Sequence, residues 1–252
     1  MVRHILSMYW DNIDPNIVSA QKAVFRHLGL EVTQHEATGV AHGLWMDDVL
    51  SKLSPDDSVL FVDIDCIPLH SSIVDYCFKV AEAGGICGSG QTANHLADSN
   101  LLYAAPSFLC FSIKIWNTLG RVSMLESADN DVAMGLTRSG LQNRIEIEIF
   151  LPSFVCCPKW PLSTKGATGI GTFYRGDIFH LFQSRDNKAY NFAFWYVADC
   201  ILKDRKIDYI ELHRKMNSIP IVTKNRYFRA VKRLSRAPVV LQRAISALSL
   251  PK

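Results

Sequence analysis

The sequence lacks the features of a secreted or membrane-spanning protein. It contains no C-x-x-C pair, and its seven cysteines are an odd number, so a disulfide framework is not expected. No stretch approaches the roughly 20 apolar residues of a membrane-spanning helix. The first twelve residues, MVRHILSMYWDN, hold too short an apolar run for a secretory signal. These absences predict a reduced, cytoplasmic environment.

Acidic residues are absent from one part of the chain. From Leu212 to Lys252 there are ten Lys or Arg and no Asp or Glu, which leaves 27 − 10 = 17 basic against 24 acidic residues elsewhere. The composition, 48% hydrophobic and 20% charged, is that of a globular protein with one sizeable core. We therefore expect a folded domain over residues 1–200 and a basic, partly amphipathic helical extension over residues 201–252.

Strand and helix patterns alternate along the first 70 residues. Strands are expected over 4–10, 30–37 and 59–65, and helices over 15–28 and 43–53. Asp14-Pro15 is typical of a helix start, and Gly29 of a helix end. This order predicts an α/β fold, a mixed, mainly parallel sheet flanked by helices. The carboxyl ends of parallel strands meet at one edge of such a sheet, where ligands bind.

The rest of the chain is less regular. Helices are expected over 71–83 and 114–120, and strands over 84–90, 102–112 and 145–152. The segment STKGATGIGTFYRGD holds four glycines and is expected to be a loop. Its residues 163–176 would be flexible enough to act as a lid.

Two carboxylates, Asp63 and Asp65, end the apolar strand of VLFVDIDCIPLH (59–70). A bare D-x-D arises about once by chance in a chain of this length, and Asp129-Asn130-Asp131 is a second example. The apolar strand before Asp63 and Asp65 makes this pair stronger evidence for a cation site than the bare motif. Two like charges at the end of such a strand repel unless they are solvated, protonated or paired with a cation. Oxygen ligands of this kind suit Mn²⁺ or Mg²⁺, which would bridge to substrate phosphates.

The D-x-D after an apolar strand, trailed by Ile67-Pro68-Leu69, resembles the GT-A class of nucleotide-sugar glycosyltransferases. The resemblance extends over about residues 4–185. It implies a single GT-A-like, Rossmann-like catalytic domain and a Mn²⁺ or Mg²⁺ cofactor. It also implies transfer of a sugar from a nucleotide-sugar donor, most readily a UDP-sugar, to a glycan or lipid-linked glycan, as in polysaccharide biosynthesis.

Haloacid-dehalogenase-like phosphatases share this spacing, with Asp63 as nucleophile and Asp65 as acid/base. Their motif usually ends the first strand and is completed by a later acidic pair. Here two strand-helix units come first, and Gly176-Asp177 is followed by IFHLF. The phosphatase remains the alternative hypothesis. Sugar nucleotidyltransferases need a glycine-rich loop after the first strand, and the first glycine here is Gly29.

The glycosyltransferase resemblance implies roles for further residues. His180 would join Asp65 as a metal ligand, whereas a lone histidine on an apolar strand is otherwise a hydrogen-bonded core residue. Asp63 would bind the metal through water or contact the ribose or sugar. Tyr9, Trp10 and Asp11, at the end of the first strand, would bind the nucleotide base. The segment HGLWMD (42–47) would form a second wall of this site, with Asp47 as a contact to base or ribose.

Two basic residues flank the glycine-rich segment and His180. Lys165 and Arg185 are assigned to the diphosphate, although each is also compatible with an ordinary surface charge. An inverting enzyme needs a base for the acceptor hydroxyl. Asp131 is the candidate base, and its alternative role is to cap the following helix. A retaining enzyme would need no such base.

The basic region 224–250 divides at Pro238 into two short segments. The second has an apolar stripe of Val240, Leu241, Ala244, Ile245 and Leu248. A basic amphipathic helix is typical of peripheral binding to the anionic inner face of a membrane. Packing of this segment on the domain is the alternative. Nucleic-acid binding is not expected, because stacking aromatic residues are sparse.

Overall fold

The computed structural model describes residues 1–93, 96 and 101–219. One compact unit spans Met1–Ser218, and the rest of the chain is not part of it. The compact unit thus continues past residue 200, where the sequence suggested a boundary. The basic amphipathic region 224–250 lies outside the described residues.

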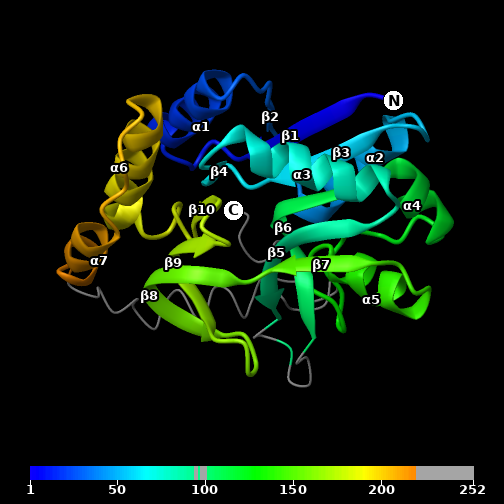
Figure 1. The fold of residues 1–252 in the computed structure, drawn as a ribbon. Coiled ribbons are helices and arrows are strands. Elements are labelled where there is room, and N and C mark those ends of the chain that lie inside the picture. Colours follow the sequence, from blue (N-terminus) through cyan, green and yellow to red (C-terminus); the bar gives the residue numbers. More distant parts are fainter. Residues whose placement is uncertain (94–95, 97–100, 220–252) are drawn as a thin grey trace, which may run out of the picture. The chain divides into compact units, whose positions relative to one another are not determined.

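A six-stranded mixed sheet forms the centre of the fold (Figure 1), in the order β2-β1-β3-β6-β5-β7. Its strands are β1 (Arg3–Tyr9), β2 (Thr33–Glu36), β3 (Ser58–Val62), β5 (Ile86–Thr92), β6 (Leu102–Ser112) and β7 (Ile147–Phe150). β1 pairs in parallel with β2 and β3, and β5 with β7. β6 runs antiparallel to both of its neighbours. The α/β class is confirmed, and the first three strands are parallel as expected.

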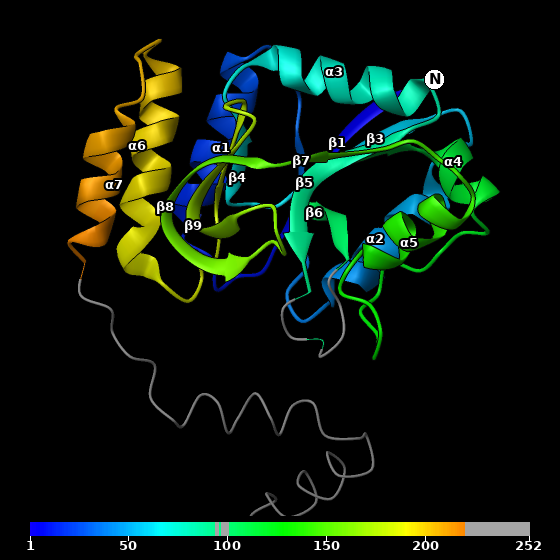
Figure 2. The ribbon, with the colours of Figure 1, turned by 60° about the horizontal axis from the view of Figure 1, so that its bottom comes forward.

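Helices cover both faces of this sheet (Figure 2). They are α1 (Pro15–His27), α2 (His42–Lys52), α3 (Ser71–Glu82), α4 (Ile113–Thr118) and α5 (Met134–Gln142). The buried strand β3 shows why both faces are apolar. Leu60 and Val62 pack with α3 on one face, whereas Val59 and Phe61 pack with α2 and α4 on the other. The predicted start of α1 is confirmed, since the Asp14 carboxylate accepts from the Asn16 N–H at 2.9 Å.

A second sheet is antiparallel and adjoins the first through the chain after β3. Its order is β4-β10-β9-β8, and its strands are β4 (Cys66–Pro68), β8 (Pro152–Pro161), β9 (Ala167–Tyr174) and β10 (Ile178–Leu181). The 3₁₀ turn η1 (Lys188–Tyr190) leads into α6 (Asn191–Leu202), which α7 (Tyr209–Asn217) follows. A separate apolar cluster lies between this sheet and α1, α6 and α7.

The expectation that residues 163–176 form a loop is wrong over Ala167–Tyr174, which is the strand β9. Its glycines allow close packing within the sheet. A Cβ on Gly169 would lie 2.0 Å from the Cys157 carbonyl oxygen, and one on Gly171 would lie 2.9 Å from the Met216 side chain. β9 pairs with both β8 and β10, so this segment is part of a sheet and does not form a lid.

Within the described residues, no helix has both the length and the apolar character needed to cross a bilayer.

Candidate metal centre and pocket

The Asp63–Asp65 turn lies where the two sheets meet. β3 ends at Val62, and β4 begins at Cys66. The buried Gln21 amide donates to the carbonyls of Asp63 and Cys66, at 2.7 and 2.9 Å, and the Asp63 N–H donates to the Ser107 carbonyl at 3.1 Å. These bonds fix the backbone of the turn. The two carboxylates are therefore held in place before any ligand binds.

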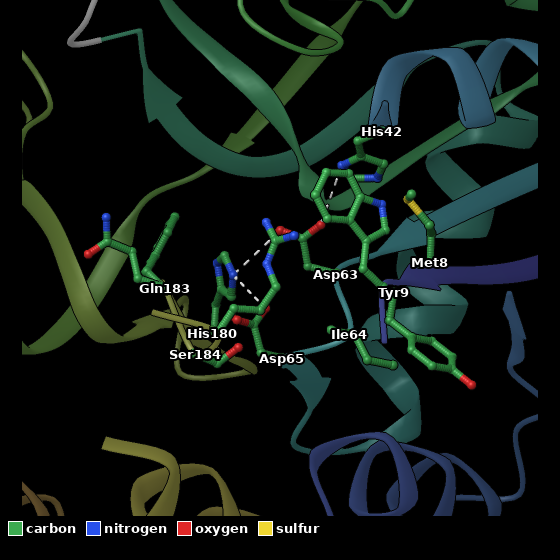
Figure 3. A pocket seen from close by; sticks show the side chains of 12 residues that line it. Met8, Tyr9, His42, Asp63, Ile64, Asp65, His180, Gln183 and Ser184 are labelled. Carbon is green, nitrogen blue, oxygen red and sulfur yellow. Dashed lines mark ion pairs between the residues drawn. The ribbon is translucent and has the colours of Figure 1, made fainter. Parts of the chain in front are cut away.

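His180 reaches this turn from β10, where it pairs directly with Cys66 of β4. Its Nε2 lies 3.2 Å from Asp65 Oδ1 and 3.5 Å from Asp63 Oδ2 (Figure 3). One ligand atom from each of the three residues lies within 4.8 Å of the others. The structure thus brings together the three residues that the sequence proposed as one site.

The carboxyl groups of this cluster differ in environment. Burial raises the pKa of Asp65, but its contacts with His180 and Ser184 have the opposite effect and leave this pKa below the ordinary 3.8. Asp65 is therefore a carboxylate at neutral pH. Asp63 is more open, with 29% of its side chain exposed against 12% for Asp65.

Two carboxylates and an imidazole are a donor set that fits a divalent cation. The like charges of Asp63 and Asp65 face one nitrogen, His180 Nε2, and a cation among them would offset their repulsion. Carboxylates suit Mn²⁺ and Mg²⁺ alike, whereas imidazole is more characteristic of Mn²⁺ than of Mg²⁺. His180 Nδ1 is buried with no hydrogen-bond partner among the described residues, so Nε2 is the nitrogen committed to the cluster.

The cluster forms one side of a pocket of about 220 Å³. Trp10 and Arg185 are part of its lining, and the Arg185 guanidinium carbon lies 5.1 Å from the centre of a Trp10 ring. The Trp10 indole N–H donates to the Val40 carbonyl at 2.9 Å, which fixes the ring. The remaining lining residues are Met8, Tyr9, His42, Ile64, Phe182, Gln183 and Ser184. An aromatic face, a guanidinium and the acidic cluster therefore share one pocket.

His42 lines the pocket, and the sequence analysis included it only as part of HGLWMD (42–47), without a role of its own. It is the first residue of α2, and its Nδ1 lies 3.9 Å from Asp63 Oδ1. Burial lowers the pKa of His42, and the nearby Arg185 lowers it further against the opposing effect of Asp63. His42 is therefore a neutral group beside Asp63. Only its place at the start of an expected helix could have marked it.

Of the four residues expected to contact the nucleoside, two line the pocket and two do not. Tyr9 and Trp10 line it, whereas Asp11 is exposed and its backbone N–H donates to Thr38 Oγ1 at 2.9 Å. Asp47 is outside the lining. Its carboxylate accepts from Ser123 Oγ at 2.6 Å and from the Met124 N–H at 2.8 Å, so it holds the loop that packs against α2.

Lys165 and Asp131 also lie outside the pocket lining. Lys165 is exposed in the turn between β8 and β9, while Arg185 lines the pocket. The Asp131 carboxylate accepts from the Tyr103 hydroxyl and from the Val132 N–H, both at 2.9 Å. The alternative expectation that Asp131 caps α5 is wrong. That helix starts after Ala133, and no side chain caps it.

Ser184 and Gln183 are pocket residues that no sequence pattern indicated. Gln183 has φ +63°, in the left-handed region that few non-glycine residues adopt. Its amide oxygen accepts from Lys159 Nζ at 2.8 Å and from Asn187 Nδ2 at 3.0 Å. Ser184 follows, 2% exposed and beside Asp65, and its hydroxyl has no well-formed hydrogen bond among the described residues.

Comparison with known proteins gives no family assignment. No protein-family model matches the chain, and no curated protein matches it. Among solved structures, the crystal structure of A197 from STIV is similar at a TM-score of 0.35 and 8% sequence identity. The match covers 58% of this chain and 81% of that chain. A TM-score this low supports no statement about activity, so a function can be inferred only from the site itself.

Proposed function

We propose that the protein is a metal-dependent glycosyltransferase with a GT-A-like catalytic domain. It would transfer a sugar from a nucleotide-diphosphate donor, a UDP-sugar first among them, to a glycan or lipid-linked glycan. The convergence of Asp63, Asp65 and His180 at the junction of two sheets carries this proposal. The cluster opens into a pocket whose lining also holds aromatic and cationic side chains.

The three residues of the cluster would contact a bound cation in different ways. Asp65 and His180 are nearly buried and in contact, so they are suited to bind Mn²⁺ or Mg²⁺ directly. The more exposed Asp63 has room for a water ligand or a sugar hydroxyl. When bound, the cation supplies Lewis-acid neutralisation of the charge on the departing diphosphate.

The pocket lining also includes side chains that suit a nucleotide. The Trp10 ring, fixed by its bond to Val40, offers a face on which a base can stack. Arg185 is the pocket's guanidinium, and its donors can pair with phosphate oxygens. Lys165 and Asp47 lie outside the lining and are not part of this proposal.

No catalytic base is assigned within the pocket. The Asp131 carboxylate is already bonded to Tyr103 and to its own neighbour's backbone. The phosphatase hypothesis is less well supported, because it requires Asp65 to donate a proton. A carboxyl group whose pKa lies below its ordinary value is a poor proton donor at neutral pH.

A ligand panel tests the proposal. The protein is heated with Mn²⁺ and each of several nucleoside diphosphates, and nucleotide-sugars are then screened for slow hydrolysis. We expect one diphosphate to raise the melting temperature only when Mn²⁺ is present, and the matching nucleotide-sugar to be hydrolysed. Hydrolysis of p-nitrophenyl phosphate with Mg²⁺, and no response to any nucleotide, would replace the proposal with the phosphatase.

A further inference from the structure

The helices α6 and α7 lie together at one edge of the compact unit (Figures 1 and 2). Three of their large apolar side chains are exposed. Trp195 and Leu202 of α6 are 38% and 36% exposed, and Ile210 of α7 is 81% exposed. Trp195 and Leu202 are seven residues apart, which places them on the same face of the helix. The Tyr196 hydroxyl accepts from the Asp208 N–H at 2.9 Å and so ties α6 to the start of α7. We call Trp195, Leu202 and Ile210 the outer edge.

The inner faces of these helices already supply the core contacts. Phe194, Val197 and Ile201 of α6 are buried against the second sheet and α1, as are Leu212 and Met216 of α7. The outer edge is therefore not needed to close the core. Large apolar side chains that stay exposed cost solvation free energy unless a partner covers them.

Charges on the same edge largely cancel. From Asp199 to Asn217 there are five Lys or Arg and four Asp or Glu, a net charge of 5 − 4 = +1. Four of the five cations also pair with Asp199 or Glu211. The described part of this edge therefore has little net attraction for an anionic surface. Any such attraction has to come from elsewhere in the chain.

The sequence immediately after α7 supplies that charge. Of the ten Lys or Arg between Leu212 and Lys252, Arg214 and Lys215 belong to α7, which leaves 10 − 2 = 8 beyond it and no acidic residue. Lys224, the first of the eight, is six residues past Ser218. A fully extended chain covers at most roughly 20 Å over that distance. A strongly basic segment therefore begins within a few residues of the end of α7 in the sequence.

We propose that the outer edge lies on an anionic lipid bilayer. Trp195, Leu202 and Ile210 enter the headgroup region, and the basic residues after Ser218 draw the edge to the surface. Tryptophan is enriched at this depth of a bilayer, and anionic lipids attract tethered Lys and Arg. A second copy of the chain is a poorer occupant, since it would bring a second basic segment to the same edge. This inference does not depend on the proposed transfer reaction.

Vesicle flotation of the full chain tests the inference. Vesicles of phosphatidylcholine alone are compared with vesicles that also contain phosphatidylglycerol. Ile210→Asp and Trp195→Ser are made on the outer edge. Leu141→Asp on α5 and Leu44→Asp on α2 are the matched controls, because these leucines are 53% and 51% exposed elsewhere on the surface. Circular dichroism and melting temperature confirm that each variant is folded.

We expect binding to the phosphatidylglycerol vesicles only, weakened about tenfold by each outer-edge variant and unchanged by either control. No binding by the wild-type chain would overturn the inference. Binding that Ile210→Asp and Trp195→Ser leave unchanged would also overturn it, since the basic segment would then act alone. Loss of binding in Leu44→Asp instead would assign the membrane contact to α2. A concentration-dependent dimer that Ile210→Asp abolishes would show that a second copy covers the edge.

Discussion

His180 Nε2 lies 3.2 Å from Asp65 Oδ1, and both side chains are almost completely buried. The two residues are 115 positions apart (180 − 65) and meet because His180 pairs with Cys66 in the register of β10 and β4. Burial of a carboxylate is unfavourable unless a partner stabilises its charge. The contact, together with the nearby Asp63, is therefore the feature of this structure that most directly indicates a bound cation.

Removing either partner of this contact should abolish metal binding. We expect Asp65→Asn and His180→Gln each to weaken Mn²⁺ binding by at least about 100-fold, because each deletes a ligand from a three-residue set. The concentration of free Mn²⁺ can be measured by electron paramagnetic resonance, and this measurement needs no substrate. Asp48→Asn, at an exposed carboxylate of α2, is the control and should bind as the wild type does. Equal binding by all four proteins would show that the cluster is not a metal site.

Ser184 should contribute to this site without contributing to stability. It lies beside Asp65 and lowers the pKa of that carboxyl group, yet its buried hydroxyl makes no well-formed hydrogen bond among the described residues. We expect Ser184→Ala to weaken Mn²⁺ binding about tenfold, as loss of a group that orients a ligand does, and to leave the melting temperature nearly unchanged.

Ser7 provides a matched control for that variant. Its hydroxyl is also buried without a partner among the described residues, but it lies in β1 and outside the pocket lining. Ser7→Ala should therefore leave Mn²⁺ affinity unchanged. If both variants weaken Mn²⁺ binding equally, the effect is a general loosening of the fold, and Ser184 has no specific role.

Arg185 and Lys165 were equivalent candidates for the diphosphate in the sequence, and the structure separates them. Arg185 lines the pocket beside Trp10, whereas Lys165 is exposed in the β8–β9 turn. A charge-assisted hydrogen bond contributes about 1.5–3 kcal/mol. We therefore expect Arg185→Ala to raise the Kd of the nucleoside diphosphate at least about tenfold in calorimetry with Mn²⁺. Lys165→Ala should leave it unchanged, and the reverse result would place the diphosphate at the β8–β9 turn.

Local patterns in the sequence were sufficient to predict the first half of the fold. The alternation of apolar strands with capped helices indicated β1, α1, β2, α2 and β3, and the place of Asp63 and Asp65 at the end of β3 followed from it. His180 could be proposed as a ligand only through the glycosyltransferase resemblance, because its apolar strand by itself indicates a core residue. Which strand runs in the reverse direction could not be predicted, because no local pattern shows that β6 lies between β5, the preceding strand, and the earlier strand β3.

The rest of the site depends on contacts that no short pattern encodes. Ser184 enters the pocket after Gln183 adopts a left-handed backbone, which is rare for glutamine and carries no sequence signal. The glycosyltransferase resemblance implied that Asp47 contacts the base or ribose. Its real partners, Ser123 and Met124, are more than 70 residues away in the chain. In both cases tertiary contacts decide the role of the residue.

The misassigned strand β9 gives a prediction about stability. Gly169 is needed for close approach of β8, since a Cβ there would lie 2.0 Å from the Cys157 carbonyl oxygen. We expect Gly169→Ala to lower the free energy of unfolding by about 3 kcal/mol in urea titrations. Gly166→Ala is the control. Gly166 has φ +100° but open space around it. Gly166→Ala should therefore lower the free energy of unfolding only by the backbone strain of alanine at positive φ, about 1 kcal/mol. If both variants lose the same free energy of unfolding, β8 can shift away from β9 without cost.

The contacts of the Asp57 carboxylate predict how the stability of the fold depends on pH. Its buried carboxylate accepts from the Val2 N–H at 2.8 Å and the Ser54 N–H at 3.2 Å, and His4 Nε2 lies 3.2 Å away. Burial raises the pKa of Asp57, but these three contacts outweigh it and leave the pKa below 3.8. Because the folded pKa is the lower one, the carboxylate stabilises the fold fully above about pH 4, and that contribution is lost as the pH falls through the folded value.

Asp57→Asn should therefore lower the free energy of unfolding at pH 7 by about 1–2 kcal/mol, since an amide cannot accept all of these bonds. It should also flatten the loss of stability between pH 5 and pH 3, because the variant has no proton to take up at this position. The neighbouring Asp56 is exposed, so Asp56→Asn should change neither quantity. Urea titrations of the three proteins at several pH values measure both effects. A variant whose stability falls as steeply as that of the wild type would show that Asp57 is not the group that titrates.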